Sequence, residues 1–205
     1  YFTDSEMLLT GQSGYPGWKS VNEHEGLARE DINLDGVDDI VGGGRWFQFL
    51  EPGKFAEHIV DASYTFSRTA AGQLIEGGRP EIILVVGDGI APLNLYEWRD
   101  GTWFPSTILE EVDNAHSIDL IDFNGDGHLD IFSAEMRLNG GNADARARVL
   151  LGDGKGRFRE VLVTEGYGHH ESRIVDLDGD GDYDIFGKPY NWKAPRVDMW
   201  IQERD

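Results

Sequence analysis

The sequence predicts an all-β protein, a β-propeller built from four blade-like repeats of about 50 residues. Glycine accounts for 27 of 205 residues and aromatic residues for 11%, a composition typical of short strands joined by tight turns. A pattern of Asp, Asn and Gly recurs along the chain, and a similar order of apolar segments follows each copy. The spacing of the copies is that of four-stranded propeller blades, so we treat residues 1–205 as a single propeller domain.

The recurring pattern has three acidic copies and one degenerate copy. The acidic copies cover residues 31–39, 122–130 and 176–184, and each has the form Asp-x-Asn/Asp-x-Asp-Gly-x-x-Asp. The degenerate copy, residues 73–81, keeps the length and closes on Glu81 but lacks acids at the first, third and fifth positions. The four copies begin 42, 49 and 54 residues apart (73 − 31, 122 − 73 and 176 − 122). Each blade is therefore expected to contain one such loop.

The same order of short strands can be assigned in each repeat. Apolar segments lie on both sides of every loop, which predicts an inner strand entering the loop and a second strand leaving it. The expected inner strands are 26–30, 68–72, 117–121 and 172–175, and the expected second strands are 40–41, 82–86, 131–132 and 185–186. Third strands are expected at 46–50, 93–98, 148–151 and 197–201. Turns then lead to outer strands at 55–59, 104–108 and 158–162.

The fourth repeat reaches residue 205 before an outer strand. Residues 1–9 have the aromatic start and aliphatic finish of the other outer strands, so we expect them to supply the missing one. Strands from both ends would then close a ring, which removes open sheet edges. Three arrangements are left open: four blades that close alone, two chains that share a ring, and a part of a larger propeller.

The acidic loops predict calcium sites. Their spacing supplies oxygen atoms at alternate positions of a tight turn, and calcium takes six to eight oxygen ligands. The expected ligands are the side chains of Asp31, Asn33, Asp35 and Asp39 with the carbonyl of Val37; Asp122, Asn124, Asp126 and Asp130 with that of His128; and Asp176, Asp178, Asp180 and Asp184 with that of Asp182. The alternative is an Asp- and Gly-rich turn that binds nothing. Three crowded copies favour about three calcium ions, while the degenerate loop should be metal-free.

These loops resemble the FG-GAP or VCBS-type repeat, whose members include the propellers of integrin α-chains. The resemblance covers nearly the whole chain and rests on the three acidic loops. It implies a propeller fold in which calcium stabilises each blade. It does not imply one function, because many functions occur on this fold.

Histidines recur at the expected start of the inner strands. His116 and His170 stand six residues before the first Asp of a loop, and His24 stands seven residues before another. A strand of six residues covers about 20 Å, so the histidines should lie at the edge opposite the calcium loops. Three converging histidines would form an open site for Zn2+ or another transition metal. The alternative is a half-exposed polar residue repeated by duplication.

Other polar and aromatic residues are expected at the same rim. Carboxylates such as Glu25 lie beside the histidines, and arginines could pair with acidic sugars. The candidate ligand-binding residues are Arg68, Glu171, Arg173, Lys188, Tyr190 and Trp192. The combination of these histidines with the segment Gly-Lys-Pro-Tyr is similar to the propeller part of fungal aldos-2-ulose dehydratase/isomerase. That similarity implies a sugar-directed role.

Composition excludes several classes of function. The chain has no cysteine, which excludes disulfides, thiolate zinc sites and cysteine catalysis. Its net charge of −20 disfavours binding to nucleic acid or to anionic membranes. The sequence contains no apolar run of about 18 residues, so we expect no membrane insertion. We expect a secreted, extracellular or periplasmic protein.

Three functions follow from these observations. The first is a calcium-stabilised propeller that binds carbohydrate or an extracellular protein. The second is a metal-dependent sugar dehydratase or lyase centred on the histidines. The third is a purely structural set of blades in a larger propeller, with no site of its own. As partners we expect carbohydrate or an extracellular protein, and either a second copy of the chain or other blades could complete the ring.

Overall fold

The computed structural model describes residues 25–64, 66–137, 141–189 and 196–203, and its regular secondary structure within these ranges is entirely β-strand. The all-β prediction is therefore confirmed. The predicted outer strand at residues 1–9 lies outside the described residues. No helix in the described part of the chain is long and apolar enough to cross a membrane.

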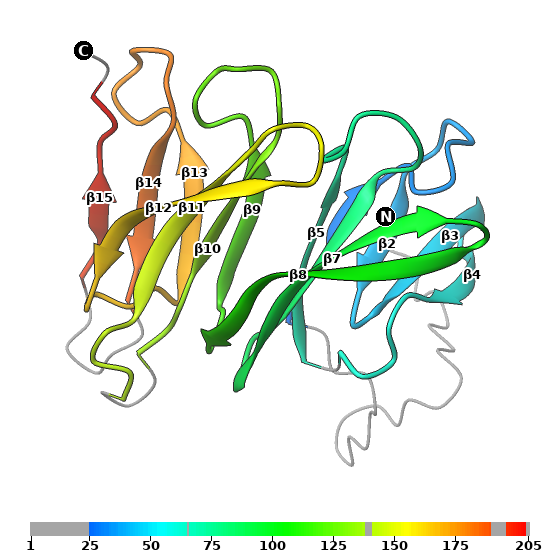
Figure 1. Cartoon of the computed structure of the whole chain (residues 1–205), viewed down its shortest axis with the longest axis horizontal. Helices are drawn as coiled ribbons and strands as arrows, with labels where there is room; N and C mark the ends of the chain where they lie inside the picture. The colour runs from blue at the N-terminus through cyan, green and yellow to red at the C-terminus, as the bar shows by residue number, and fades with distance from the viewer. Residues whose placement is uncertain (1–24, 65, 138–140, 190–195, 204–205) are drawn as a thin grey trace.

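Four antiparallel sheets follow one another along the chain, one for each repeat (Figure 1). The first contains β1 (Ala28–Glu30), β2 (Asp39–Gly42), β3 (Arg45–Glu51) and β4 (Lys54–Ile59). The second contains β5 (Ser67–Gly72), β6 (Glu81–Val86), β7 (Ile90–Arg99) and β8 (Thr102–Asp113). The third contains β9 (Ser117–Ile121), β10 (Asp130–Ala134), β11 (Arg146–Gly152) and β12 (Phe158–Glu165). The fourth contains β13 (Glu171–Val175), β14 (Asp184–Lys188) and β15 (Asp198–Trp200).

The sheets are meanders whose first strands lie side by side. β5 contacts β1 and β9, and β13 contacts β9, so the inner strands form a continuous series. Figure 1 shows the first and fourth sheets at opposite ends of a row. The described residues thus form an open row of blade-like sheets. Closure into a ring stays a prediction.

The core lies between successive sheets, and strand alternation assigns each residue to one interface. Ile82 packs toward the first sheet with Val41, whereas its neighbour Ile83 packs toward the third sheet with Ile131. The same rule places Ile185 against Phe132 of the third sheet. Each sheet therefore uses one face for the sheet before it and the other for the sheet after it.

The face of the fourth sheet that points away from the third sheet is more exposed than the corresponding face of the third sheet. Phe132 pairs with Val149 across the third sheet, and the equivalent pair in the fourth sheet is Phe186 with Met199. Phe132 and Val149 are 1% and 3% exposed, but Phe186 and Met199 are 38% and 62% exposed. The fourth sheet therefore carries, on the face that points away from the third sheet, apolar residues of the kind that are buried between sheets elsewhere, but here they are exposed.

Candidate functional site

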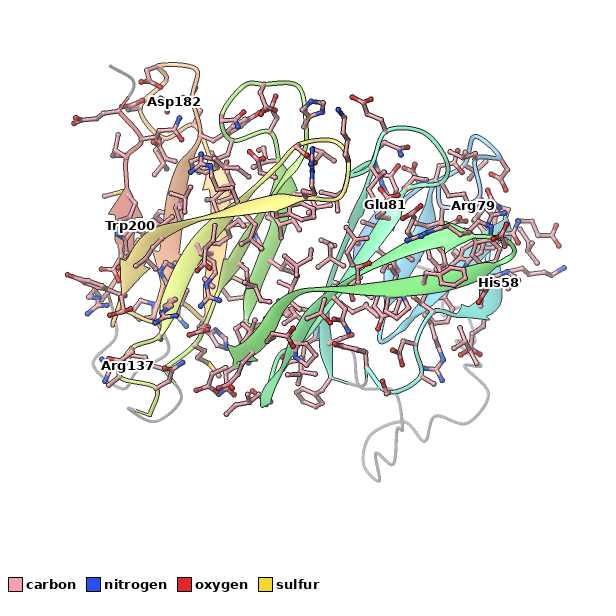
Figure 2. The ribbon with its side chains drawn as sticks, in the orientation of Figure 1. His58, Arg79, Glu81, Arg137, Asp182 and Trp200 are labelled. Atoms are coloured by element: carbon pink, nitrogen blue, oxygen red, sulfur yellow. The ribbon has the colours of Figure 1, made fainter. Side chains whose placement is uncertain are left out.

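The acidic loops and the degenerate loop stand along one edge of the row, at the top of Figure 1. Each loop joins the inner strand of its sheet to the second strand, so antiparallel pairing brings all four to the same side. Figure 2 shows Asp182 of the last loop at this edge and Arg137, just after β10, at the opposite edge. The starts of the inner strands lie at that opposite edge, as the sequence predicted.

The first Asp of every acidic loop organises the backbone of its turn. Asp31 accepts hydrogen bonds from the backbone N–H groups of Asp35 and Gly36 at 3.0 and 2.7 Å. Asp122 accepts the equivalent bonds from Asp126 and Gly127, and Asp176 accepts those of Gly179 and Gly181. The sixth-position glycine has a φ of 90° in all three loops, a conformation that favours glycine. The repeated sequence therefore builds one repeated turn.

The ninth position of each loop holds a buried acid. Asp130 is fully buried, and its two oxygens accept separate backbone N–H groups, from Gly152 at 2.8 Å and Phe123 at 2.9 Å. Asp184 is bonded in the same way by Gln202 and Leu177. Because one donor belongs to the loop and the other lies at or beyond the end of the third strand, this carboxylate fastens the loop to the body of its sheet.

Among the three acidic loops, the one in the fourth sheet, residues 176–184, has the most convergent carboxylates. Oxygens of Asp176, Asp178 and Asp184 lie within 4.8 Å of one another, an arrangement that could hold a cation. In the other two loops the third position is Asn33 or Asn124, and its amide donates to the fifth-position Asp at 2.8 and 2.9 Å. These amides partly offset the crowding of negative charge there.

The degenerate loop is held by side chains of a different kind. Gln73 occupies the position of the first Asp, and its amide donates to the backbone carbonyls of Ile75 and Gly77. Leu74 is 1% exposed and lies in the core between the second and third sheets. Glu81 replaces the ninth-position Asp, and one of its oxygens accepts N–H groups from both Leu74 and Ile75 at 2.9 Å. Packing and neutral donors thus fill the role that cations would have in the other loops.

At the opposite edge, polar side chains from all four sheets meet around His116. This cluster, here called the rim, consists of Glu25, Arg68, Asp88, His116, His170 and Glu171. His116 directly precedes β9 and His170 directly precedes β13, which agrees with their expected place at the strand starts. Their rings stack, with centroids 4.9 Å apart and an angle of 22° between the planes.

His116 is buried between two carboxylates and a guanidinium. Its side chain is 5% exposed, and Nε2 lies 2.9 Å from Oδ1 of Asp88 and 3.4 Å from Oε2 of Glu25. Nδ1 lies 3.4 Å from Nη2 of Arg68. Since a guanidinium only donates, Nδ1 acts as the acceptor and Nε2 carries the proton that faces the carboxylates. One ligand atom from each of Glu25, Asp88 and His116 lies within 4.8 Å of the others, which could hold a metal ion.

Burial and charge tune the other members of the rim. Burial raises the pKa of Glu25, although His116 and Arg68 act against the rise. Burial, His116 and Lys188 together lower the pKa of His170. Burial works to raise the pKa of Glu171, but its hydrogen bond with Arg68, at 2.9 Å, prevails and the pKa is lowered.

The structure brings together part of the predicted site. Arg68, Glu171, His116 and His170 share the rim, whereas Lys188 is exposed and accepts the backbone N–H of His170 through its carbonyl. Arg173 lies on β13, farther along the inner strand. His24, Tyr190 and Trp192 lie outside the described residues. Because the rings of His116 and His170 are stacked, the lone pairs of their nitrogens lie in two nearly parallel planes and do not point at one shared metal ion. His116 with Glu25 and Asp88 is therefore a better ligand set than the two histidines together.

Asp88 was not found by sequence reasoning. It lies between β6 and β7, and the turn brings it beside the inner strand of the next sheet. Gly87 before it gives a weak signal: a Cβ there would lie 2.0 Å from Oε2 of Glu25. This glycine therefore makes room for the Glu25 carboxylate.

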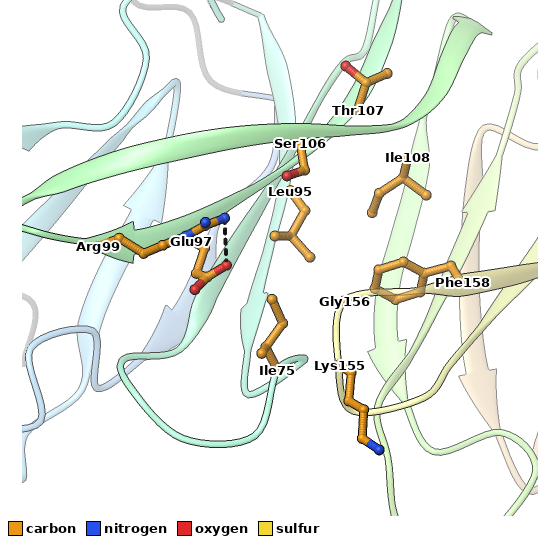
Figure 3. A pocket seen from close by; sticks show the side chains of 10 residues that line it. All are labelled: Ile75, Leu95, Glu97, Arg99, Ser106, Thr107, Ile108, Lys155, Gly156 and Phe158. Carbon is orange, nitrogen blue, oxygen red and sulfur yellow. Dashed lines mark ion pairs between the residues drawn. The ribbon is translucent and has the colours of Figure 1, made fainter.

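Two grooves of about 360 Å3 each lie away from the rim side chains. One lies between the second and third sheets, where Figure 3 shows Ile75, Leu95, Ile108 and Phe158 with the ion pair of Arg99 and Glu97. The other crosses the inner strands and is lined by residues of β1, β5, β9 and β13, with Leu27 just before β1.

Comparison with known families supports the repeat assignment. The family model of the FG-GAP-like repeat matches residues 78–133, which run from the degenerate loop of the second sheet to β10 of the third. No curated protein matches the chain. The similarity to aldos-2-ulose dehydratase/isomerase therefore stays a prediction based on motifs.

Proposed function

We propose that the chain is a calcium-stabilised extracellular domain of the β-propeller type that binds carbohydrate at the rim. The observation that carries this proposal is the convergence of charged and imidazole side chains from four successive sheets. Glu25 precedes β1, Arg68 lies on β5, His116 precedes β9 and Glu171 begins β13. Side chains that meet only through the assembly of four sheets form a site that no single repeat contains. Sites of this kind combine orientation of a ligand with specificity.

The chemistry of the rim suits a ligand rich in hydroxyl groups. A sugar hydroxyl both donates and accepts, and the rim offers carboxylate acceptors beside the donors of Arg68 and the imidazoles. Half of the rim residues are carboxylic acids, namely Glu25, Asp88 and Glu171, which disfavours an anion at the centre of the cluster. A neutral sugar unit at this point is therefore the ligand that the rim favours.

A glycan panel tests this proposal. The wild-type chain, kept in excess Ca2+, is expected to retain a subset of soluble glycans, and isothermal titration then gives the affinity. His116→Ala should weaken binding at least tenfold, because it removes the residue that contacts four members of the rim. Arg159→Gln, an exposed change on β12, is the matched control and should bind normally. Failure of the wild type to bind any glycan would contradict the proposal.

Calcium has a structural role in this proposal. The repeated turns around Asp31, Asp122 and Asp176, and the convergent oxygens of the fourth loop, support the assignment. Three Ca2+ ions would change the formal charge from −20 to −20 + 6 = −14. An extracellular location agrees with this proposal, because free Ca2+ is abundant there.

A second candidate is a metal-dependent sugar dehydratase or lyase, favoured by the group of Glu25, Asp88 and His116. Around a Zn2+-sized ion with bonds of about 2.1 Å, neighbouring ligand atoms lie about 3.0 to 3.4 Å apart. The two distances from His116 Nε2, 2.9 and 3.4 Å, are close to that range. Glu25 Oε2 is buried without a hydrogen-bond partner among the described residues, which also fits a cation ligand.

In this candidate, a divalent ion and the proton on His116 Nε2 compete for the same position. A bound ion would act as a Lewis acid for a sugar carbonyl. His170 lies next to the group and is able to accept a proton. The reaction class is an elimination in which a base takes the proton from the carbon beside a carbonyl. A C=C bond forms as the C–O bond on the next carbon breaks, and the hydroxyl leaves as water with the proton returned by the protonated base.

Elemental analysis separates the two candidates. Protein purified without chelator is measured by plasma mass spectrometry, before and after His116→Ala. About three calcium ions alone support the binding domain. One further zinc or manganese ion that His116→Ala abolishes supports the enzyme, and a transition-metal content unchanged by His116→Ala contradicts it.

A further inference from the structure

The fourth sheet, at one end of the row, has an apolar face that no other described sheet covers (Figure 1). Phe186 and Met199 pair on this face and are 38% and 62% exposed. Ile174 of β13 packs toward the third sheet, so its neighbour Val175 points away from that sheet, and Val175 is 39% exposed. The three strands of this sheet thus all place apolar side chains on the outward face.

The first sheet has a corresponding face at the other end of the row. Val41 and Trp46 pack toward the second sheet, so strand alternation turns Ile40 of β2 to the opposite face. Phe49 of β3 and Phe55 of β4 pair on that opposite face, with their rings edge to face at 5.7 Å. Phe55 is 44% exposed. Both ends of the row therefore present apolar side chains to solvent.

Residues on the outward face of the first sheet have buried counterparts between other sheets. Ile40 directly follows the ninth-position acid of its loop, as Ile131 does in the third sheet. Ile131 is fully buried in the core between the second and third sheets, and Phe158, which like Phe55 lies at the start of an outer strand, packs against the same core. The first sheet thus has the kind of face that the third sheet turns toward the sheet before it. The outward face of the fourth sheet is of the complementary kind, which a sheet turns toward the sheet after it.

Charged side chains at the two end faces are already paired within the chain. The pairs are Arg29 with Asp38, Arg45 with Glu57, and Arg173 with Glu171. A contact between the faces therefore needs no new ion pair, and burial of apolar surface is its driving force. The net charge of −20 on each chain opposes association of two copies, and this repulsion is screened over about 8 Å at physiological salt.

Contacts that skip a sheet show that the row is curved. Glu25, just before the first sheet, lies 3.4 Å from His116 at the start of the third, and Arg68 of the second sheet lies 2.9 Å from Glu171 of the fourth. Strand starts that are two sheets apart are thus close together, so the sheets fan out from a shared inner edge. A sheet packed on either end face would continue this curve.

We propose that a second copy of the chain covers both end faces, with the fourth sheet of each copy packed on the first sheet of the other. Two chains then close a ring of eight sheets through two identical contacts. A second copy is the favoured occupant because each chain holds both complementary faces, so one kind of molecule covers all four. An additional outer strand beside β15 would extend the fourth sheet without covering its face. The proposal is independent of the ligand at the rim.

Sedimentation equilibrium of the full chain in excess Ca2+ and 0.15 M NaCl tests the proposal. Between about 1 and 100 µM protein, the mass should rise to that of two chains and no further, and about 0.5 M NaCl should strengthen the association by screening the repulsion. Met199→Glu and Phe55→Glu each place a charge in one face. Each variant should stay monomeric, because both contacts of the ring use both faces. Arg159→Gln, an exposed change on β12 of the third sheet, is the control and should dimerise as the wild type does.

A mixture of the two variants tests the head-to-tail arrangement. Met199→Glu keeps an intact first sheet and Phe55→Glu an intact fourth sheet, so the mixture should associate through one remaining contact while neither variant associates alone. Circular dichroism and thermal melts of the monomeric variants check that both are folded. A wild type that stays monomeric at about 100 µM, or that grows beyond two chains, would overturn the proposal. The same holds if Phe55→Glu dimerises as tightly as the wild type, or if mixing the variants gives no association.

Discussion

Replacing Glu81 by glutamine is expected to stabilise the protein at pH 8 and to have little effect below pH 5. Glu81 is 1% exposed at the end of the degenerate loop, and burial raises its pKa to about 7. Both loop N–H donors, those of Leu74 and Ile75, bind the same oxygen, Oε2. A glutamine carbonyl can accept both bonds while carrying no charge. The substitution therefore removes the cost of a buried charge and keeps the hydrogen bonds of the loop.

The sign and size of the effect follow from the pKa. Glu81 titrates near pH 7 in the folded protein and near 4.5 when unburied, so the folded state binds more protons between these values. Its contribution to stability is fully present below about pH 4.5 and is lost as the pH rises through 7. The difference of about 2.5, at 1.36 kcal/mol per pH unit, corresponds to about 3 kcal/mol. Glu81→Gln should recover up to this amount at pH 8.

Urea unfolding at pH 5 and pH 8, in constant excess Ca2+, measures this difference between wild type and variant. Asp130→Asn is the control at the equivalent position of the third sheet. There the two carboxylate oxygens accept separate backbone N–H groups, those of Phe123 and Gly152. The NH2 group of an asparagine would face one of these N–H groups, so the substitution should destabilise the folded protein by about 1–3 kcal/mol at both pH values. An effect of Glu81→Gln that is equal at pH 5 and pH 8 would refute the reasoning.

Three further outcomes are expected. Excess EGTA should lower the melting temperature, and Asp178→Ala should reproduce part of that loss while Glu76→Ala does not; equal losses in a thermal melt would contradict the calcium assignment. Leu74→Ala should cost about 2–5 kcal/mol in urea unfolding, because the side chain is 1% exposed, and a cost below 1 kcal/mol would show that the degenerate loop does not need this packing. In the second candidate function, where Glu25, Asp88 and His116 would bind zinc, Gly87→Ala should weaken that binding in a competition titration by displacing Glu25, with an unchanged circular dichroism spectrum; unchanged affinity would exclude Glu25 as a ligand.

The order of strands could be predicted because its signals are local. The acidic loop marks the end of one strand and the start of the next, and the inner strand expected at 117–121 coincides with β9. The outer strands were predicted too short. β8 covers Thr102–Asp113 rather than 104–108, and register shifts interrupt the later part of its pairing with β7, so the regular alternation of the sequence does not mark where the strand ends. A shift of register depends on two strands and is not visible in one.

The site could be predicted only in part for a related reason. His116 and His170 were found because they recur at a fixed distance from the loops. Asp88 belongs to one repeat alone and gains its role from the next sheet, so no periodic signal marks it. The sequence also could not indicate the stacking of the two imidazoles, which depends on how the third and fourth sheets meet.

The open face of the fourth sheet has a consequence for local stability. In a row of sheets, each sheet is stabilised mainly by its direct neighbours, as in other repeat proteins. The second sheet has buried contacts on both faces, whereas Phe186 and Met199 leave much of one face of the fourth sheet in water. Opening of β13–β15 thus exposes less new apolar surface than opening of β5–β8. In the monomer, amide hydrogens of the fourth sheet should therefore exchange before those of the second sheet.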